Sequence, residues 1–164
     1  MVIIIDGTIS KSIYIYIYKE NTLFLKKESK DLNIYEYLDK FFRSIDINDI
    51  VCIGINIGPG AFSSTRSSVA FIAGFSMGSK IPVIGISGFD VLLKMGKPLI
   101  IDAMRGNAYI KYKDKFLIKK DCVGAKIDYN VFFNIVNEKL QKGEFSNPLT
   151  LLPLYMDKSF ISGK

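Results

Sequence analysis

The segment Ser63–Ser79 has apolar or small side chains around its whole circumference when it is placed on a helix of 3.6 residues per turn. Arg66 is its only charged residue before Lys80. A helix that is apolar on every side has to be buried on opposite sides. The rest of the chain must therefore supply a sheet for one side of this helix and some other cover for the opposite side.

The remaining segments predict such a sheet. Runs of β-branched residues, or alternation at period two, indicate strands, whereas apolar residues at helical spacing indicate helices. Ser87 and Asp90 form a capping-box pattern at the start of one helix. The predicted strands are Val2–Asp6, Ser12–Tyr18, Thr22–Lys26, Ile50–Ile57, Pro82–Ile86, Pro98–Asp102, Ala108–Tyr112 and Lys115–Ile118, and the other helices are Asn33–Ile45, Ser87–Lys94 and Tyr129–Leu140.

Three strands precede the first helix, and strands then alternate with helices. This order predicts an α/β fold with a mixed sheet and helices packed against it. In the strand Ser12–Tyr18, Ile side chains share one face and Tyr side chains share the other, so we expect both faces to be covered. With 164 residues and 49% hydrophobic content, the chain can bury one core.

Composition restricts the chemistry that the chain can perform. It has no His, which disfavours His-dependent triads and zinc hydrolases. Cys52 and Cys122 are far apart and no CxxC spacing occurs, so we expect no disulfide framework, no metal and no cofactor. The net charge of +6 permits a nucleic-acid partner, but Lys outnumbers Arg 19 to 3, so the charge favours compositional bias over a direct RNA site.

No apolar run approaches the roughly 18 to 20 residues that a bilayer span needs. The opening residues Met1–Asp6 lack the features of a signal peptide. We therefore expect a cytoplasmic protein with no membrane partner.

A Gly-Pro-Gly loop connects the strand Ile50–Ile57 to the helix Ser63–Ser79. Backbone N–H groups at such a turn can bind an anion, so a candidate anion-binding loop is formed by Gly58, Gly60, Ser63 and Ser64. The Lys that a P-loop needs after the second Gly is missing. A tight turn with Ser63 or Ser64 as N-cap accounts for the same residues, and the spacing favours the turn.

Small residues form a stripe along the helix behind this loop, which permits close approach of another helix. The helix is either at a subunit interface or at the centre of the core, covered by the helix Asn33–Ile45. We favour the interface. Its candidate residues are Arg66, Ser67, Ala70, Ala73, Gly74, Met77 and Gly78.

The loop resembles the signature of the TsaB (YeaZ) family, Gly-Pro-Gly-Ser-Phe-Thr-Gly-Leu-Arg, which reads Gly-Pro-Gly-Ala-Phe-Ser-Ser-Thr-Arg here. The segments Ile3–Thr8, Ile101–Tyr109 and Pro153–Met156 are also similar to family segments. The chain departs from the family pattern at Ser64, Thr65 and Asn107, and its region 111–150 looks shortened.

The resemblance implies a shortened member with the actin-like ATPase (ASKHA, ribonuclease H-like) fold, divided into residues 1–103 and a reduced half, 104–164. It implies a non-catalytic partner subunit for a TsaD-type homologue, which transfers a threonylcarbamoyl group to the adenosine next to the tRNA anticodon. Expected partners are that homologue, a second copy when the chain is alone, tRNA through the complex, and a TsaE-type ATPase. The catalytic homologues hold a metal through His, which this chain lacks.

Two other functions stay open. Asp6 and Asp102 each begin a turn after a strand, as magnesium-binding carboxylates do in actin-like ATPases, so an autonomous nucleotide-binding phosphotransferase or ATPase is the alternative. A strand-end Asp is more often structural. An assembly protein whose homodimer is the end product would use the same apolar surface. A peptidase is disfavoured, because metal ligands and a nucleophile paired with a base are both missing.

Overall fold

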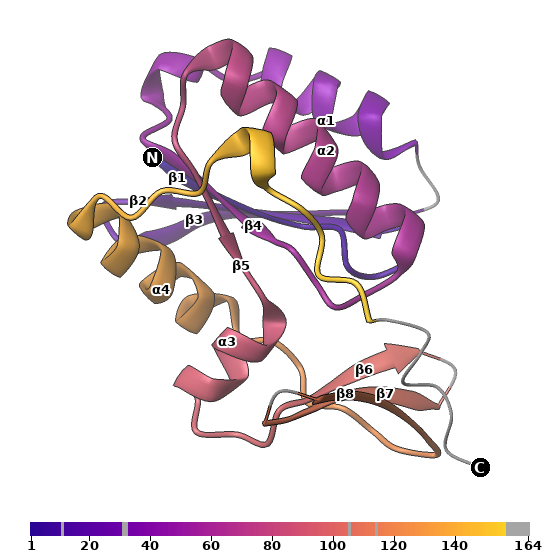
Figure 1. Ribbon diagram of the computed structural model, residues 1–164. Coiled ribbons are helices and arrows are strands. Elements are labelled where there is room, and N and C mark those ends of the chain that lie inside the picture. The colour runs from indigo at the N-terminus through magenta and orange to yellow at the C-terminus, as the bar shows by residue number, and fades with distance from the viewer. Residues whose placement is uncertain (11, 31–32, 105, 114, 157–164) are drawn as a thin grey trace.

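The computed structural model describes residues 1–10, 12–30, 33–104, 106–113 and 115–156 of the chain. Two sheets organise these residues, one in the order β3-β2-β1-β4-β5 and the other in the order β6-β7-β8 (Figure 1). The strands are β1 Val2–Asp6, β2 Ser12–Lys19, β3 Thr22–Lys30, β4 Cys52–Asn56, β5 Val83–Ile86, β6 Ile100–Met104, β7 Asn107–Tyr112 and β8 Lys115–Lys120. The helices are α1 Ile34–Arg43, α2 Phe62–Ser79, α3 Gly88–Lys94 and α4 Tyr129–Lys142, with short 3-10 turns η1 Ile47–Asp49 and η2 Pro148–Thr150.

The first sheet is mixed. Strand β1 pairs antiparallel with β2 and parallel with β4, and β4 pairs parallel with β5. The parallel pairs are linked through helices, as parallel connections require. Because β1 and β4 run side by side in the same direction, Asp6 and Asn56 at their carboxyl ends lie at the same edge of the sheet.

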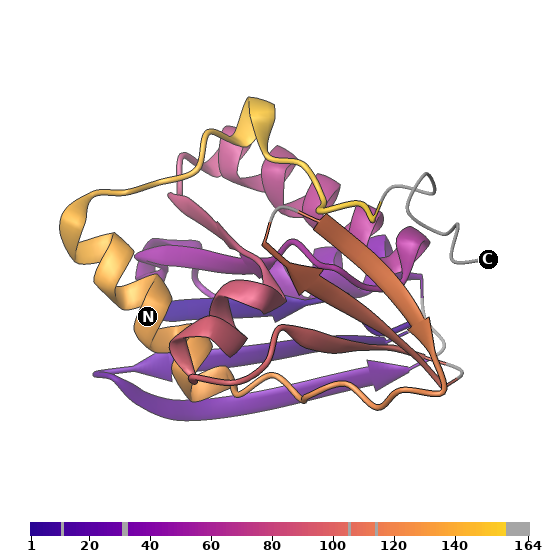
Figure 2. The same cartoon turned by 60° about the horizontal axis from the view of Figure 1, so that its bottom comes forward.

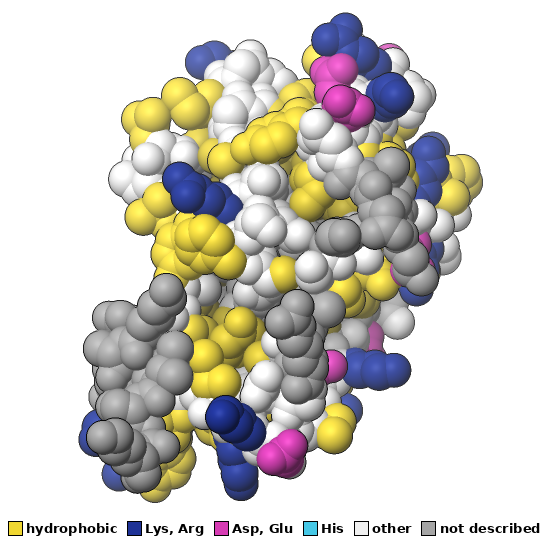
Figure 3. All heavy atoms as spheres, turned by 90° about the vertical axis from the view of Figure 1, so that its right-hand side faces the viewer, with side chains coloured by type: hydrophobic (Ala, Val, Ile, Leu, Met, Phe, Trp, Pro, Cys, Tyr) yellow, Lys and Arg dark blue, Asp and Glu magenta, His cyan; other side chains and the backbone are white. Residues whose placement is uncertain are grey.

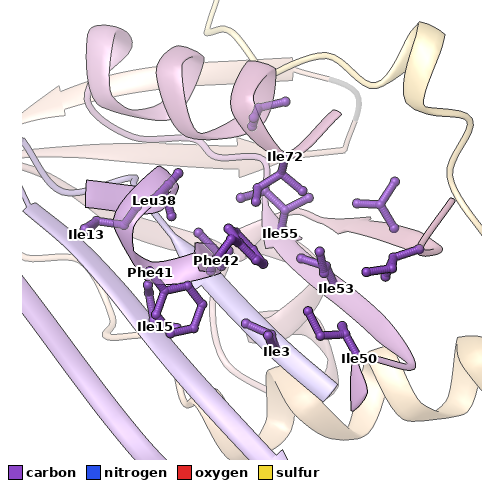
Figure 4. Packing of buried hydrophobic residues seen from close by; sticks show 14 of the residues in the cluster. Ile3, Ile13, Ile15, Leu38, Phe41, Phe42, Ile50, Ile53, Ile55 and Ile72 are labelled. Carbon is purple, nitrogen blue, oxygen red and sulfur yellow. The ribbon is translucent and has the colours of Figure 1, made fainter. Parts of the chain in front are cut away.

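Helices cover both faces of this first sheet. Figure 1 shows α1 and α2 on one face and α4 on the other. Under α1 and α2, isoleucines of the sheet pack against Leu38, Phe42 and Ile72 (Figure 4). On the opposite face, Phe132 and Val136 of α4 pack against Ile4, Tyr16 and Tyr18. The sheet is therefore the middle layer of three.

The two faces of β2 meet different helices. Ile13, Ile15 and Ile17 belong to the cluster under α1 and α2, while Tyr16 stacks on Tyr129 of α4 with ring centroids 4.0 Å apart. Close contact of α4 with the sheet also depends on a glycine in β4. A Cβ placed on Gly54 would lie 2.7 Å from Cγ2 of Val136, so no larger residue fits without a shift.

The second sheet has one covered face. Phe89 and Leu92 of α3 pack on Ile101 and Phe116, and the carboxy-terminal segment joins this cluster through Leu154. That segment is tied to the first half by the backbone N–H of Leu154, which donates to the carbonyl oxygen of Ile57 at 2.7 Å. Figure 2 shows the three-stranded sheet as a layer of its own beside the five-stranded one.

The elements agree with those predicted from the sequence, including the capping box that Ser87 and Asp90 form at α3. The α/β fold class with a mixed sheet is confirmed. Strand β6 begins at Ile100, later than predicted, and continues past Asp102, so Asp102 lies inside a strand and does not begin a turn. The predicted boundary between residues 103 and 104 falls within β6, and the division into two halves stays a prediction. Among the described residues, no helix is long and apolar enough to cross a membrane.

Candidate functional site

The carboxylate of Asp6 lies at the edge of the first sheet where three segments meet. It accepts hydrogen bonds from the backbone N–H of Thr8 at 2.7 Å, from Nδ2 of Asn56 at 2.8 Å and from the hydroxyl of Tyr129 at 2.5 Å. Oδ1 of Asn56 in turn accepts from the backbone N–H of Gly58 at 3.0 Å. These bonds join β1, β4, the Gly-Pro-Gly loop and α4 at one buried point.

Tyr129 closes this point from α4. Burial raises the pKa of its hydroxyl far above the ordinary value, and the nearby negative charge of Asp6 raises it further, so the hydroxyl stays protonated and donates. Asp6 itself is only 1% exposed. A buried carboxylate whose oxygens already accept three hydrogen bonds is poorly placed to coordinate magnesium, which keeps several waters in its shell. This geometry favours a structural role for Asp6.

A cavity of about 480 Å³ opens beside this corner, between the first sheet and β6. It brings Asp6 and Asp102 to the walls of one space although they are far apart in sequence. Lys26, Glu28 and Tyr14 line it from β2 and β3. Because three acids and two lysines line the same space, the cavity has no strong bias toward anions or cations.

The Gly-Pro-Gly loop is packed against the amino-terminal segment. A Cβ on Gly60 would lie 2.4 Å from Cβ of Thr8, so this position requires glycine. The backbone N–H of Ala61 donates to the carbonyl oxygen of Thr8 at 2.7 Å, and the carbonyl oxygen of Gly58 accepts from the N–H of Gly88 at 2.8 Å. Gly58 is buried with a φ of 112°. These contacts match the tight turn, and anion binding by the loop stays a prediction.

The start of α2 differs from the expected capping. The helix begins at Phe62, its N-cap is Ala61, and no side chain caps it, so the expected N-cap role of Ser63 or Ser64 is wrong. Ser63 is exposed and Ser64 is buried, both within the first turn of the helix. The chain reaches this end of α2 already held by the bond from Ala61 to Thr8, and that bond fixes the helix entry.

An apolar cavity of about 550 Å³ lies against this first turn of α2. Its walls come from the helix start, from β7 and β8, and from the carboxy-terminal segment, where the ring of Tyr155 lies 5.3 Å from that of Phe62. Thr65 also lines it, and its hydroxyl Oγ1 is buried without a hydrogen-bond partner among the described residues.

The outward face of α2 is open in the isolated chain. Helix α1 covers one flank of α2, where Phe42 stacks on Phe75 with centroids 4.1 Å apart, and η2 lies near the other. The small residues Ala70, Gly74 and Gly78 face solvent, and among the described residues no atom outside the helix's own backbone lies within 4 Å of a Cβ placed on either glycine. The stripe therefore faces away from the core.

The chain matches the family model of TsaD, tRNA N6-adenosine threonylcarbamoyltransferase, over residues 28–161. It belongs to the TsaD family. Two solved structures share its fold: an uncharacterized protein with similarity to peptidase YEAZ from Pseudomonas aeruginosa, and YeaZ from the same organism. They have TM-scores of 0.66 and 0.64 and identities of 12% and 13%, and the alignments cover 95% and 94% of this chain and 99% of each of theirs. No curated protein matches the sequence.

These matches confirm the actin-like ATPase fold expected from the TsaB (YeaZ) resemblance. In this TsaD-family chain, the candidate interface residues share one side of α2. Arg66, Ala70, Gly74, Met77 and Gly78 are exposed, whereas Ser67 and Ala73 are half-buried. Figure 3 shows one face of the molecule, on which apolar side chains lie between scattered charged groups. No group of three or more metal-binding side chains occurs in the described part of the chain.

Sequence reasoning missed the partners of Asp6. A signal for Asn56 existed, because a polar residue ends an otherwise apolar buried strand. No such signal pointed to Tyr129, because it is 123 positions from Asp6 and no local pattern indicates that α4 packs across the first sheet. Burial raises the pKa of the Cys52 thiol to about 12, so the thiol stays protonated at neutral pH.

Proposed function

We propose that this chain is a non-catalytic partner subunit in the formation of tRNA threonylcarbamoyladenosine. Family membership over most of the chain supports a role in this modification. In the proposal, the chain binds a TsaD-type catalytic homologue through the outward face of α2 and supports its activity. When alone, it forms a homodimer through the same face.

The observation that carries the proposal is the exposed, nearly uncharged side of α2. Met77 is 45% exposed and Phe62 is 63% exposed, and they flank the open stripe of Ala70, Gly74 and Gly78. Each large apolar side chain gains about 1.5 to 3 kcal/mol on burial. A stripe without side-chain bulk allows a second helix to approach closely enough to bury both residues, and Arg66 at the edge can meet an acidic group of the partner.

The proposed lack of catalysis rests on the residues available for chemistry. The chain contains no His, so the metal-binding histidines of the catalytic homologues have no counterpart. Asp6, the best candidate for phosphate or magnesium chemistry, is buried and accepts three hydrogen bonds within the protein. Both facts favour a supporting subunit over the autonomous phosphotransferase or ATPase.

Reconstitution tests this proposal. The chain and its TsaD-type homologue from the same cell are mixed with tRNA, the other substrates of the reaction and, in a parallel reaction, a TsaE-type ATPase. Threonylcarbamoyladenosine formation and co-elution of the two proteins are measured. We expect product to require both proteins. Full activity of the homologue alone refutes the subunit role, and ATP hydrolysis by this chain alone that is lost on Asp6→Asn supports the phosphotransferase.

A matched pair of variants tests the surface. Ala70→Arg places a charge on the open stripe of α2, where it would be buried without a partner in a complex. Asn134→Arg adds the same charge to an exposed position of α4. Both variants should stay folded by circular dichroism, but only Ala70→Arg should be monomeric and fail to co-elute with the homologue. Equal binding by both variants places the interface elsewhere.

A further inference from the structure

The hairpin of β7 and β8 concentrates positive charge. Residues 107–120 contain five lysines, and Asp114 is the one acidic residue of this stretch. The hairpin gives these lysines defined positions. Side chains alternate between the two faces of an antiparallel hairpin, so each lysine of the two strands lies on one face or the other.

One face of the hairpin is open and basic. The cross-strand pairs Tyr112 with Lys115 and Ile110 with Leu117 place these four residues on one face, and Lys119 lies on the same face two positions after Leu117. We name Tyr112, Lys115, Leu117 and Lys119 the hairpin face. All four are exposed, with Tyr112 at 64% and Leu117 at 42%. The opposite side of β8 turns inward, where Phe116 packs against Phe89 of α3.

The hairpin lysines form no ion pair with the acidic residues that the structure describes. Across the described residues, none of Lys111, Lys113, Lys115, Lys119 and Lys120 lies within ion-pair distance of a carboxylate. Two helix lysines, in contrast, form ion pairs: Lys94 pairs with Glu138 at 2.9 Å, and Lys139 pairs with Glu144 at 3.2 Å. The charge of the hairpin lysines is therefore not neutralised by any acidic side chain that the structure describes, and it is available to an anionic partner.

The chemistry of this face fits a polyphosphate backbone. Lys is a compact charge that contacts phosphates without reading bases, and exposed aromatic rings offer a stacking surface to unpaired bases. Tyr112 supplies such a ring, with Nζ of Lys113 5.7 Å from its centroid. Lys115 and Lys119 are four positions apart on one strand, about 13 Å, a span that reaches more than one phosphate of a nucleic-acid strand.

We propose that the hairpin face binds RNA through its phosphate backbone and, resting on the function proposed above, that this RNA is the tRNA being modified. The face lies on β7 and β8, and the interface proposed for the catalytic homologue lies on α2 (Figure 1). One chain would then hold the homologue on one surface and the RNA on another. Lysine contacts of this kind position the RNA and leave sequence recognition to other groups.

Binding of a fluorescently labelled tRNA transcript to the purified full chain tests the proposal. We expect a dissociation constant of about 10⁻⁴ to 10⁻⁶ M that weakens with salt, as phosphate contacts do. The double variant Lys115→Gln, Lys119→Gln should bind about tenfold more weakly for each lysine replaced at about 0.1 M salt, and the slope of log K against log salt should fall by about two.

Three controls decide the outcome. The double variant Lys40→Gln, Lys142→Gln removes the same charge from exposed positions on α1 and α4 and should leave binding within about twofold. Lys115→Arg with Lys119→Arg keeps the charge and should restore binding. Unlabelled tRNA should displace the labelled RNA. Equal losses in both Gln variants, or no displacement by unlabelled tRNA, overturn the proposal.

Co-elution with the catalytic homologue separates this proposal from the proposed function. The hairpin variant should still co-elute, because α2 is unchanged. If it loses the homologue but keeps RNA binding, the hairpin face is a protein interface and the inference is wrong. If wild-type chain binds tRNA through the hairpin but never co-elutes with the homologue, the partner role fails while the RNA surface stands.

Discussion

The two sheets of the protein differ in how they are covered. The five-stranded sheet has helices on both faces, and its isoleucines are nearly all inaccessible to solvent. The three-stranded sheet has α3 and the carboxy-terminal segment on one face, and leaves Tyr112 and Leu117 exposed on the other. The first sheet therefore provides most of the buried apolar area, and the second provides a surface.

The same contrast holds inside α2. Its inner residues, such as Val69 and Ile72, are fully buried against the first sheet, while Ala70 and Gly74 one position or a few positions away face solvent. A segment that is apolar all round is thus divided by the fold into a core side and an open side. Residues that look alike in the sequence are expected to differ greatly in their effect on stability.

The largest difference is expected between a buried residue under the first sheet and an exposed residue of the second sheet. Phe132→Ala on α4 removes a fully buried ring from the first sheet and should lower the free energy of unfolding by about 3 to 5 kcal/mol. Leu117→Ala in the second sheet should cost less than about 1 kcal/mol, since surface changes are usually small. Urea unfolding followed by circular dichroism measures both, and similar losses would mean that the hairpin face is buried in solution.

A smaller loss is expected from the corner that holds α4 on the first sheet. Tyr129→Phe removes the hydroxyl that donates to Asp6 and leaves a buried carboxylate with one hydrogen bond fewer. Hydrogen bonds to charged groups contribute about 1.5 to 3 kcal/mol, so unfolding should become easier by that amount. Tyr112→Phe on the exposed hairpin is the control and should change stability by less than about 0.5 kcal/mol. If Tyr129→Phe leaves the free energy of unfolding unchanged, water replaces the hydroxyl as a hydrogen-bond donor to Asp6.

Alkaline pH should destabilise the packing of α4 on the first sheet, because buried tyrosines lie between them. Burial, followed by the charge of Asp128, raises the pKa of Tyr18 to about 12, and burial also raises the pKa of Tyr16 and Tyr129. A tyrosine whose pKa is raised in the folded state stabilises the protein below its unfolded pKa of about 10, and this stability is lost as pH rises toward the folded value.

The urea midpoint should therefore be level from neutral pH to about 9 and fall between about 10 and 12. Tyr18→Phe should make that fall shallower, at the cost of the hydrogen bond from the Tyr18 hydroxyl to the carbonyl oxygen of Tyr129. An identical pH profile in the variant would mean that Tyr18 is accessible to solvent in the folded protein.

Local patterns were enough to predict most elements of both sheets. The Ile and Tyr faces of β2, the all-apolar α2 and the capping box at α3 each depend on neighbours in sequence, so their periodicity predicts them. Contacts between segments that are far apart in the sequence could not be predicted in this way. The covering of β2 by α4 joins Tyr16 to Tyr129 across more than a hundred positions, and the tie from Leu154 to Ile57 is similarly distant.

The candidate site shows the same limit. The strand-end position of Asp6 and the glycine loop were evident, because turn chemistry is local. Whether Asp6 is free or engaged depends on Asn56 and Tyr129, and the distinction between a catalytic and a structural carboxylate rests on those distant donors. Likewise, periodicity could not say which side of α2 is open, since all sides are apolar and only the positions of α1 and η2 decide it.

The smallest effect, and the sharpest test of the open side of α2, is expected from Gly74→Ala. Gly74 lies in the interior of the helix and has open space around its Cβ position, so alanine should stabilise the isolated chain by about 0.5 to 1 kcal/mol. If a partner helix packs closely on the stripe, the added methyl group overpacks that contact, and affinity for the homologue should fall about five- to tenfold. Asn134→Ala on the exposed side of α4 also improves helix propensity and should stabilise the chain without weakening the complex. Thermal unfolding and binding titrations on both variants separate the two effects. A Gly74→Ala chain that is more stable and binds the homologue as tightly as the wild type would show that the stripe is exposed in the complex too.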